Sequence, residues 1–458
     1  MFSRRRAISF LRPSLVSDQF NLQRSPKLRI AVFTNKFPHY VSTFLSHDIR
    51  ALLDAGCDVD LFPFYPLDSK LWRYVPDILN DTVLPRAKIH HVGLIESLAS
   101  LRPWPVRKVG RFVRDALVVS ASATRFGVMP FAKSLYVIPK AWAWERLYSN
   151  SYDHILAYWG NYAATCAYLF HRLENRRVPF SMFLHAGIDL YADQVYLPQK
   201  LLYADNIIVV CDYNRRFIQK LYPDLYPVIS HKIIKYHLGL DLSGFPYHPN
   251  ERLPDKILAV GGLYKYKGYE FLLRAMHELT CRGVDYNLEL VGDGTEGHAL
   301  KQLARKLAIS DKVRFSGWLQ PKEVRAAMQQ ATVFVHPSYG IGDAVPTVIK
   351  ECMALGTPVI ASDMVGIPEL LDEGRCGILV PPGNPRELAN AIETLLKSST
   401  LRLRYADVAR RYAESTFDLR RNGRQLANLI NSTTRDNTRR GGHLLNLNSR
   451  DNNEAAST

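Results

Sequence analysis

Short apolar runs alternate with segments of helical spacing along the chain, and this alternation constrains its fold more than any other feature. Leu28–Thr34 is a continuous apolar run of the kind that forms a parallel strand buried on both faces. A helical segment follows it, ending at Gly56, and a second strand begins at Val59. Similar runs occur at His154–Trp159, Phe180–Leu184, Ile207–Val210, Ile257–Val260, Leu288–Val291, Val313–Phe315, Val333–Val335 and Val359–Ala361. The pattern predicts an α/β protein with two Rossmann-like halves.

The segment 336–362 contains a predicted helix whose start lacks an ordinary cap. Pro346 takes the first helical position, where its missing N–H costs nothing, and Val345 before it has no side-chain acceptor. The first N–H groups of the helix, at Thr347 and Val348, are therefore expected to have no local partner. A helix N-terminus of this kind favours an anion.

Two carboxylates flank this helix start. Asp343 lies in the preceding loop, and Glu351 lies eight positions later, where a helical side chain leans back toward the N-terminus. Two carboxylates and several backbone donors would then converge on one place, which suits a ligand with both hydroxyls and phosphates. The spacing alone also has ordinary explanations, with Asp343 as a displaced cap and Glu351 as a solvated helix residue.

The motifs around this helix resemble a known donor site. The segments HPS, G-x-x-x-P, E-C-M-A-x-G-x-P-V-I, G-I-P-E-L and G-I-L-V-P-P-G occur in the order found in retaining family-4 glycosyltransferases, the glycosyl transferases group 1. Those enzymes have an E-x7-E signature, in which Asp343 replaces the first Glu here. The resemblance covers residues 28–430 and is strongest over 256–385. It implies the GT-B fold and transfer of a sugar from a nucleotide-sugar to an acceptor hydroxyl, with retention of anomeric configuration.

The resemblance also assigns roles to single residues. Asp343 would contact the transferred sugar, Glu351 would accept hydrogen bonds from the ribose, and Lys267 would hold the diphosphate with the helix N–H groups. His185, in the segment H-A-G-I-D, would line the opposite wall, and its place just after a strand favours the ligand crevice, although a lone His is often structural. The other donor-binding candidates are Gly262, Lys265, Gly292, Trp318, Leu319, Ser338, Gly342, Pro346, Thr347 and Val348.

Two further positions depart from the family pattern. Relatives have an Arg and a Lys that both grip the diphosphate; Lys267 matches the Lys, but Gly262 replaces the Arg. Because a bidentate guanidinium is lost, either Lys265 or Arg215 substitutes for it or donor binding is weak. Tyr158 occupies a place where relatives often have His. These departures keep a second interpretation open: a catalytically weak or inactive subunit that binds nucleotide-sugar or glycan in a biosynthetic assembly.

The expected organisation has an insertion in the first half. Residues 95–150 break the alternation with Arg and Lys interleaved with Trp and Phe, typical either of a helix at an anionic membrane or of an ordinary helical layer. The expected parts are a basic arm at 1–26, an acceptor-side Rossmann-like domain at 27–245, a linker at 246–255, a nucleotide-sugar-binding Rossmann-like domain at 256–400, helices crossing back at 401–431, and a disordered tail at 432–458.

The formal charge of +16 predicts an anionic partner, which could be nucleic acid, anionic lipid or nucleotide-sugar phosphates. No nucleic-acid module is recognised, so we expect a nucleotide-sugar donor and a glycan or lipid-linked acceptor, and no nucleic acid. The six cysteines have no metal-type spacing, and Asp58-Val-Asp60 alternates along a strand, so no metal and no cofactor are expected. Reduced thiols and the lack of a bilayer-length apolar run predict a cytoplasmic protein, with peripheral contact to the membrane left open.

Overall fold

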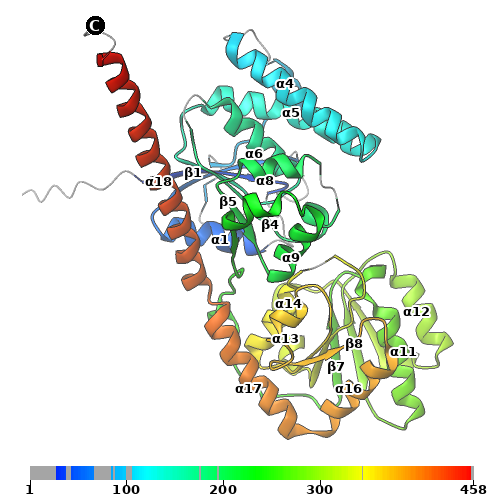
Figure 1. Ribbon diagram of the computed structural model, residues 1–458. Helices are drawn as coiled ribbons and strands as arrows, with labels where there is room; N and C mark the ends of the chain where they lie inside the picture. Colours follow the sequence, from blue (N-terminus) through cyan, green and yellow to red (C-terminus); the bar gives the residue numbers. More distant parts are fainter. Residues whose placement is uncertain are drawn as a thin grey trace, which may run out of the picture.

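The computed structural model describes residues 27–37, 43–65, 84–85, 88–99, 106–174, 177–192, 195–342 and 344–454. Figure 1 shows two α/β domains, one built mainly from the first half of the chain and one from the second. Each domain contains a six-stranded sheet, in the orders β2-β1-β3-β4-β5-β6 and β12-β11-β10-β7-β8-β9. All strand pairs in the described residues are parallel. The predicted pair of Rossmann-like domains is thus confirmed.

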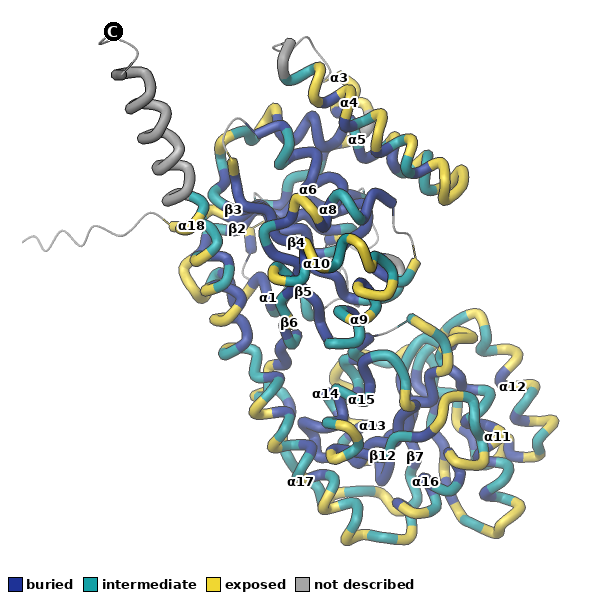
Figure 2. The backbone as a smooth tube through the Cα atoms, in the orientation of Figure 1, coloured by how far each residue is buried: buried dark blue, intermediate teal, exposed yellow. Residues whose placement is uncertain are grey.

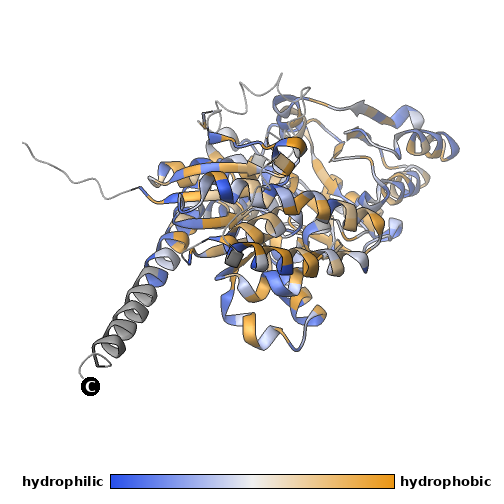
Figure 3. Ribbon diagram, turned by 90° about the horizontal axis from the view of Figure 1, so that it is seen from above, coloured by the Kyte–Doolittle hydropathy of each residue, from blue (hydrophilic) through white to orange (hydrophobic). Residues whose placement is uncertain are grey.

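The strands of the first domain coincide with the apolar runs of the sequence, and nearly all of their residues are buried. Its strands are β1 (Arg29–Thr34), β2 (Asp58–Pro63), β3 (His154–Ala157), β4 (Phe180–Leu184), β5 (Asn206–Val209) and β6 (Ile233–Lys235). Its helices are α1 (Thr43–Asp54), α6 (Tyr162–Leu173), α7 (Gly187–Leu190), α8 (Leu197–Tyr203), α9 (Asp212–Leu221) and α10 (Tyr226–Ile229). The apolar character of the strands is visible in Figure 3.

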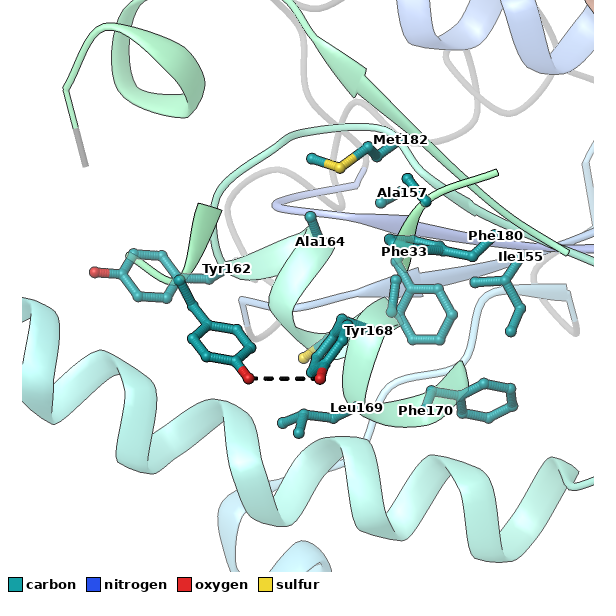
Figure 4. Packing of buried hydrophobic residues seen from close by; sticks show 14 of the residues in the cluster. Phe33, Ile155, Ala157, Tyr162, Ala164, Tyr168, Leu169, Phe170, Phe180 and Met182 are labelled. Atoms are coloured by element: carbon teal, nitrogen blue, oxygen red, sulfur yellow. Dashed lines mark hydrogen bonds between the residues drawn. The ribbon is translucent and has the colours of Figure 1, made fainter. Parts of the chain in front are cut away.

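The predicted insertion is helical and forms α3 (Leu94–Ala99), α4 (Val106–Thr124) and α5 (Val128–Tyr148). Helix α5 packs on α6, while α4 lies at the outer side of the domain (Figure 1). Trp144 of α5 joins Phe33, Phe62 and Phe170 in the aromatic core, part of which Figure 4 shows. No helix within the described ranges is both long enough and apolar enough to cross a membrane.

The second domain repeats the alternation of strand and helix. Its strands are β7 (Lys256–Val260), β8 (Asn287–Val291), β9 (Val313–Gly317), β10 (Val333–His336), β11 (Val359–Ser362) and β12 (Ile378–Val380). Its helices are α11 (Tyr269–Cys281), α12 (Gly297–Lys306), α13 (Pro321–Gln330), α14 (Thr347–Leu355), α15 (Ile367–Leu370) and α16 (Pro385–Lys397). Figure 2 shows its buried strands between helices with exposed outer faces.

Two crossings join the domains. One is the segment between β6 and β7, which contains the predicted linker at 246–255, and the other joins α17 (Ser399–Thr416) to α18 (Leu419–Glu454). The crossings are bonded to each other, because the Leu240 N–H donates to Phe417 O at 2.7 Å and the Leu419 N–H donates to Leu240 O at 3.2 Å. Helix α18 then packs on α1, as Figure 1 shows.

The first residues of the predicted disordered tail at 432–458 belong to α18, and the prediction for the rest of the tail stays a prediction. Polar side chains anchor this part of α18 to the first domain: Asn206 Nδ2 donates to Thr433 Oγ1 at 2.9 Å, and Asn437 Nδ2 donates to Arg177 O at 2.7 Å. A polar segment whose composition is typical of disorder thus makes specific hydrogen bonds with the first domain. Residues 455–458 and the predicted basic arm at 1–26 lie outside the described residues.

Candidate functional site

The strand order of the second sheet reverses between β7 and β10. Open α/β sheets bind ligands beyond the carboxyl ends of the strands at such a point. Two loops meet there, residues 261–268 after β7 and 337–346 after β10, since the N–H groups of Tyr339 and Gly340 donate to Tyr266 O at 2.9 and 3.1 Å. All predicted donor-binding residues follow β7, β8, β9 or β10 along the chain, so they belong to one edge of the sheet.

Glycine is required at two positions of this edge. Gly268 has a φ of 69°, and a Cβ there would lie 2.0 Å from Pro337 O. Gly292 has a φ of 134°, and a Cβ there would lie 2.0 Å from Gly261 O. The missing side chains therefore let the loops after β7, β8 and β10 approach one another backbone to backbone, the geometry that phosphate-binding loops use.

Helix α14 begins at Thr347, one residue later than predicted, with Pro346 in an extended conformation before it. Within the described residues no side chain caps this start. The half-buried residues Thr347 and Val348 thus provide the first N–H groups of an α-helix at the edge where the strand order reverses. Asp343, the predicted sugar contact, lies outside the described residues.

Glu351 and Lys350 lie side by side on α14. Burial raises the pKa of the Glu351 carboxyl, and the nearby charges of Lys350 and Arg325 act in the opposite direction. Burial likewise lowers the pKa of Lys350 to about 8, while Glu351 and Asp48 oppose it. A half-buried carboxylate of this kind gains from hydroxyl donors, because hydrogen bonds to the charged form offset its desolvation.

His185 follows β4 directly, as the sequence predicts. Its Nε2 lies 2.9 Å from Tyr158 O, so Nε2 carries the proton, whereas buried Nδ1 has no hydrogen-bond partner in the described part of the chain. Burial lowers the pKa of His185 to about 4. The imidazole is therefore neutral at pH 7 and offers Nδ1 as a hydrogen-bond acceptor.

The backbone around His185 is fixed by two buried polar residues. Asp189 accepts hydrogen bonds from the N–H groups of His185 at 2.9 Å and Ala186 at 2.8 Å. Asn214 Nδ2 donates to His185 O at 2.8 Å. Burial raises the pKa of Asp189 to about 6, and these backbone donors partly offset it. The H-A-G-I-D segment thus holds a rigid turn at the start of α7.

The two domains meet beside this turn. A Cβ on Gly187 would lie 3.1 Å from Gly342 O, so the turn after His185 lies against the loop after β10. Nearby, Glu369 Oε2 accepts from the Asp212 N–H at 2.6 Å, and Glu369 Oε1 accepts from Lys235 Nζ at 2.8 Å. The structure therefore brings the loop of His185 and the loop before α14 together.

The remaining predicted residues differ in how accessible they are. Lys265 is exposed and Lys267 half-buried, in a 3-10 turn. Trp318 is 56% exposed, whereas Leu319 packs in the apolar cluster beside α14. Ser338 is buried, and its hydroxyl lies 3.0 Å from His336 Nε2. Trp318 therefore does not pack into the core and remains available to a planar ligand.

The structure shows what surrounds Gly262, which stands where the resembled glycosyltransferases have an Arg. A Cβ on Gly262 would lie 2.4 Å from the ring of Tyr264, so this ring occupies the space where a larger residue at 262 would begin. Arg215, considered as a substitute, donates to Ile233 O at 3.2 Å and lies 3.9 Å from Asp212. Its guanidinium is engaged in the first domain.

Sequence reasoning missed a buried cluster around Asp48 of α1. The Asp48 carboxylate accepts hydrogen bonds from Tyr158 and from Tyr236, the latter at 2.7 Å. Burial raises the pKa of Asp48 to about 6, and the two tyrosines and Lys350 oppose this rise. Tyr158, which stands where the resembled glycosyltransferases often have His, thus donates a hydrogen bond to the Asp48 carboxylate. The only hint of this cluster in the sequence is that Asp48 lies on a predicted helix that also carries apolar residues.

Two other features lie outside this site. In the D-x-D segment, Asp58 pairs with Lys88 at 2.8 Å and Asp60 with His90 at 2.8 Å. The described residues contain no group of three or more side chains that could together hold a metal ion. A cavity of about 290 Å³ is lined by residues that directly precede strands, such as Asp255, Thr332 and Pro358, and by residues of α16 and α17, so it lies at the opposite edge of the second sheet.

Comparisons with known proteins agree with this arrangement. Residues 248–412 match the family described as glycosyl transferases group 1. The chain is 25% identical over 416 residues to a protein of Escherichia coli (strain K12) named as a colanic acid biosynthesis glycosyltransferase, covering 88% of this chain and 99% of the relative. It is 24% identical over 419 residues to the amylovoran biosynthesis glycosyltransferase of Erwinia amylovora, with coverage of 88% and 99%.

Solved structures show the same fold. Anabaena HepE in complex with UDP-glucose has a TM-score of 0.64 at 17% identity, over 88% of this chain and 100% of that one. Sucrose-phosphate synthase from Thermosynechococcus elongatus has a TM-score of 0.64 at 19% identity, over 89% and 99%. At these identities the likeness establishes the two-domain GT-B architecture alone.

Proposed function

Since residues 248–412 form a glycosyl transferases group 1 domain and the chain is a glycosyltransferase, we propose that it is a retaining hexosyltransferase of family 4 in exopolysaccharide biosynthesis. It would move a sugar from a nucleotide-sugar to a hydroxyl of a glycan or lipid-linked saccharide. The uncapped start of α14, at the edge where the loops after β7 and β10 meet, carries the proposal. The two relatives matched over their whole length support the pathway, because both bear exopolysaccharide names.

In this proposal the donor diphosphate binds at the start of α14. The N–H groups of Thr347 and Val348 and the ammonium of Lys267 would face the phosphate oxygens, and Glu351 would accept hydrogen bonds from the ribose hydroxyls. These fixed groups favour the charge that develops on the departing diphosphate. They supply this stabilisation without a metal ion, so the proposed reaction requires no metal and no cofactor.

The sugar would lie between the two domains. Asp343 would contact its ring hydroxyls from the second domain, and His185 Nδ1 would accept a hydrogen bond from another hydroxyl. Because His185 is neutral at pH 7, it orients the sugar without carrying charge. We propose no covalent nucleophile for the retaining step.

A second candidate function is a subunit that binds nucleotide-sugar but transfers it weakly. Gly262 favours it, because this position supplies no guanidinium for the diphosphate and the nearby Tyr264 ring occupies the space beside it. The six cysteines are all unpaired, as expected in a reducing compartment, so we place either activity in the cytoplasm.

A thermal-shift screen against UDP-, GDP- and ADP-sugars tests the proposal, followed by an assay for release of the nucleoside diphosphate. We expect one donor to raise the unfolding midpoint, since a ligand that binds only the folded state stabilises it. Release of diphosphate with that donor and a glycan acceptor supports transfer. Stabilisation without any release supports the binding subunit, and no stabilisation by any donor contradicts both.

A further inference from the structure

The hairpin formed by α4 and α5 has an unusual distribution of charge. Residues 106–148 contain eight basic and two acidic residues. Both acids are buried and paired: Asp115 accepts from Arg172 Nε at 3.0 Å, and Glu145 accepts from Lys108 Nζ at 2.9 Å. The charge that the hairpin presents to solvent is therefore positive.

The same hairpin exposes large apolar side chains. Eight of the twenty large apolar residues that are exposed among the described residues lie on it: Val113, Leu117, Val118, Phe126, Val128, Met129, Leu135 and Leu147. Leu117 is 65% exposed, Val128 85% and Met129 65%. A concentration of this kind marks an interaction surface, since single exposed apolar residues are ordinary but a group is not.

The apolar and basic residues share one side of α4 and the turn. Arg114 precedes Leu117 by three positions and Val118 by four, so the three side chains are neighbours on one helix face. At the turn, exposed Arg125 lies next to Phe126, and the start of α5 adds Val128 and Met129. Apolar side chains thus lie directly beside guanidinium groups along α4 and its turn.

We propose that this hairpin face docks on an anionic phospholipid bilayer. Phe126, Val128 and Met129 enter the interfacial region, while Arg114 and Arg125 bind lipid phosphates. Charge complementarity selects this occupant. Such a bilayer offers phosphates to the guanidinium groups and an apolar layer to the exposed apolar side chains, whereas a nucleic-acid backbone would leave the apolar side chains unused. The inference depends on the hairpin alone and not on the reaction proposed above.

Vesicle flotation with the full chain tests the proposal. We expect the chain to float with vesicles of equimolar phosphatidylcholine and phosphatidylglycerol, and to bind vesicles of phosphatidylcholine alone about tenfold less. The double substitution Val128→Ser with Met129→Ser should lower binding to the anionic vesicles about tenfold through lost apolar burial. Arg114→Gln with Arg125→Gln should lower it similarly and reduce its dependence on salt.

A matched control uses Leu403→Ser with Arg404→Gln, an exposed apolar and basic pair on α17 in the second domain, and should leave flotation unchanged. Circular dichroism and the unfolding midpoint should match the wild type in all variants, because the substituted side chains are exposed. The proposal is overturned if the wild type does not float, if it binds both vesicle types equally, or if the hairpin variants float like the control. Self-association of the wild type through this face without flotation would also overturn it.

Discussion

Lys350 Nζ donates a hydrogen bond of 3.0 Å to the backbone oxygen of Leu238, and this bond ties α14 of the second domain to the chain leaving β6 of the first. Lys350 is 1% exposed, so its ammonium group is almost entirely removed from water. Since Glu351 is the next residue, the bond also fixes the helix that carries the proposed ribose contact.

Replacing Lys350 with Met should destabilise the chain. The substitution keeps the side chain's length, but it leaves Leu238 O without its donor and removes the positive charge that opposes the buried acids Asp48 and Glu351. An unsatisfied buried acceptor alone costs about 1–3 kcal/mol. Urea denaturation measures the change. Lys397→Met is the control, because the Lys397 side chain is 68% exposed and should leave the midpoint unchanged. Equal midpoints for the two variants would show that the bond contributes nothing.

Glu351→Ala should abolish the stabilisation by the nucleotide-sugar identified in the screen, because the ribose hydroxyls lose their acceptor. The unliganded variant should unfold at or above the wild-type midpoint, since burial already disfavours the Glu351 carboxylate. Differential scanning fluorimetry with and without donor checks both statements. Exposed Glu387 of α16 provides the control substitution Glu387→Ala. A donor-induced shift that persists in Glu351→Ala would remove Glu351 from the site.

His185 should make the fold sensitive to acid. Its pKa is about 4 in the folded chain and about 6.5 when unfolded, so the unfolded chain binds more protons as the pH falls through this window. The fold therefore keeps its full stability with respect to His185 above pH 6.5, where the imidazole is neutral in both states. It loses stability as the pH falls toward 4, because the unfolded chain takes up the proton first. Between pH 7 and pH 5, the wild type should lose about 2 kcal/mol more than His185→Gln. Urea titrations at the two pH values give the difference, and parallel losses would refute the assignment.

Gly268→Ala should lower the free energy of unfolding more than Gly283→Ala does, although both glycines have a φ near 70°. At Gly283 an added Cβ meets no atom within 4 Å, so only the backbone conformation is penalised, by about 1–2 kcal/mol. At Gly268 the Cβ would also lie 2.0 Å from Pro337 O, which forces the loops after β7 and β10 apart. Denaturant unfolding compares the variants, and the donor-induced shift should fall only in Gly268→Ala. Similar costs would mean that the loops separate freely.

The sequence was sufficient to predict the strands and the two-domain arrangement. Runs such as Phe180–Leu184 and Val359–Ala361 lie in strands because continuous apolar segments are stable only when both sheet faces are covered. The C-terminal end of α14 was also predictable, because glycine is the residue that most often follows a helix. Gly356 adopts the left-handed conformation that such a position requires, with a φ of 73°. These features depend on local composition, which the sequence displays directly.

Features that depend on distant partners could not be predicted in this way. Asp48 looks like a solvated helix residue until Tyr158 and Tyr236, from two other elements, are placed over it. The polar composition around Thr433 and Asn437 of α18 likewise gives no sign of the hydrogen bonds that these residues make with Asn206 and with Arg177 O. The roles given to Asp343, Glu351 and Lys267 stay predictions, because they rest on the resemblance and on ligands that only binding experiments can supply.

The paired crossings at Leu240 and Phe417–Leu419 have a mechanical consequence. A single flexible connecting segment would let the two domains rotate relative to each other in any direction. Two connecting segments that are hydrogen-bonded side by side resist twisting and bend more easily about one axis. A relative motion of the two domains that keeps these hydrogen bonds would therefore bend both segments together at this place. Cleavage of either connecting segment by a protease would leave the two domains joined by the other segment alone, and the domains could then twist relative to each other.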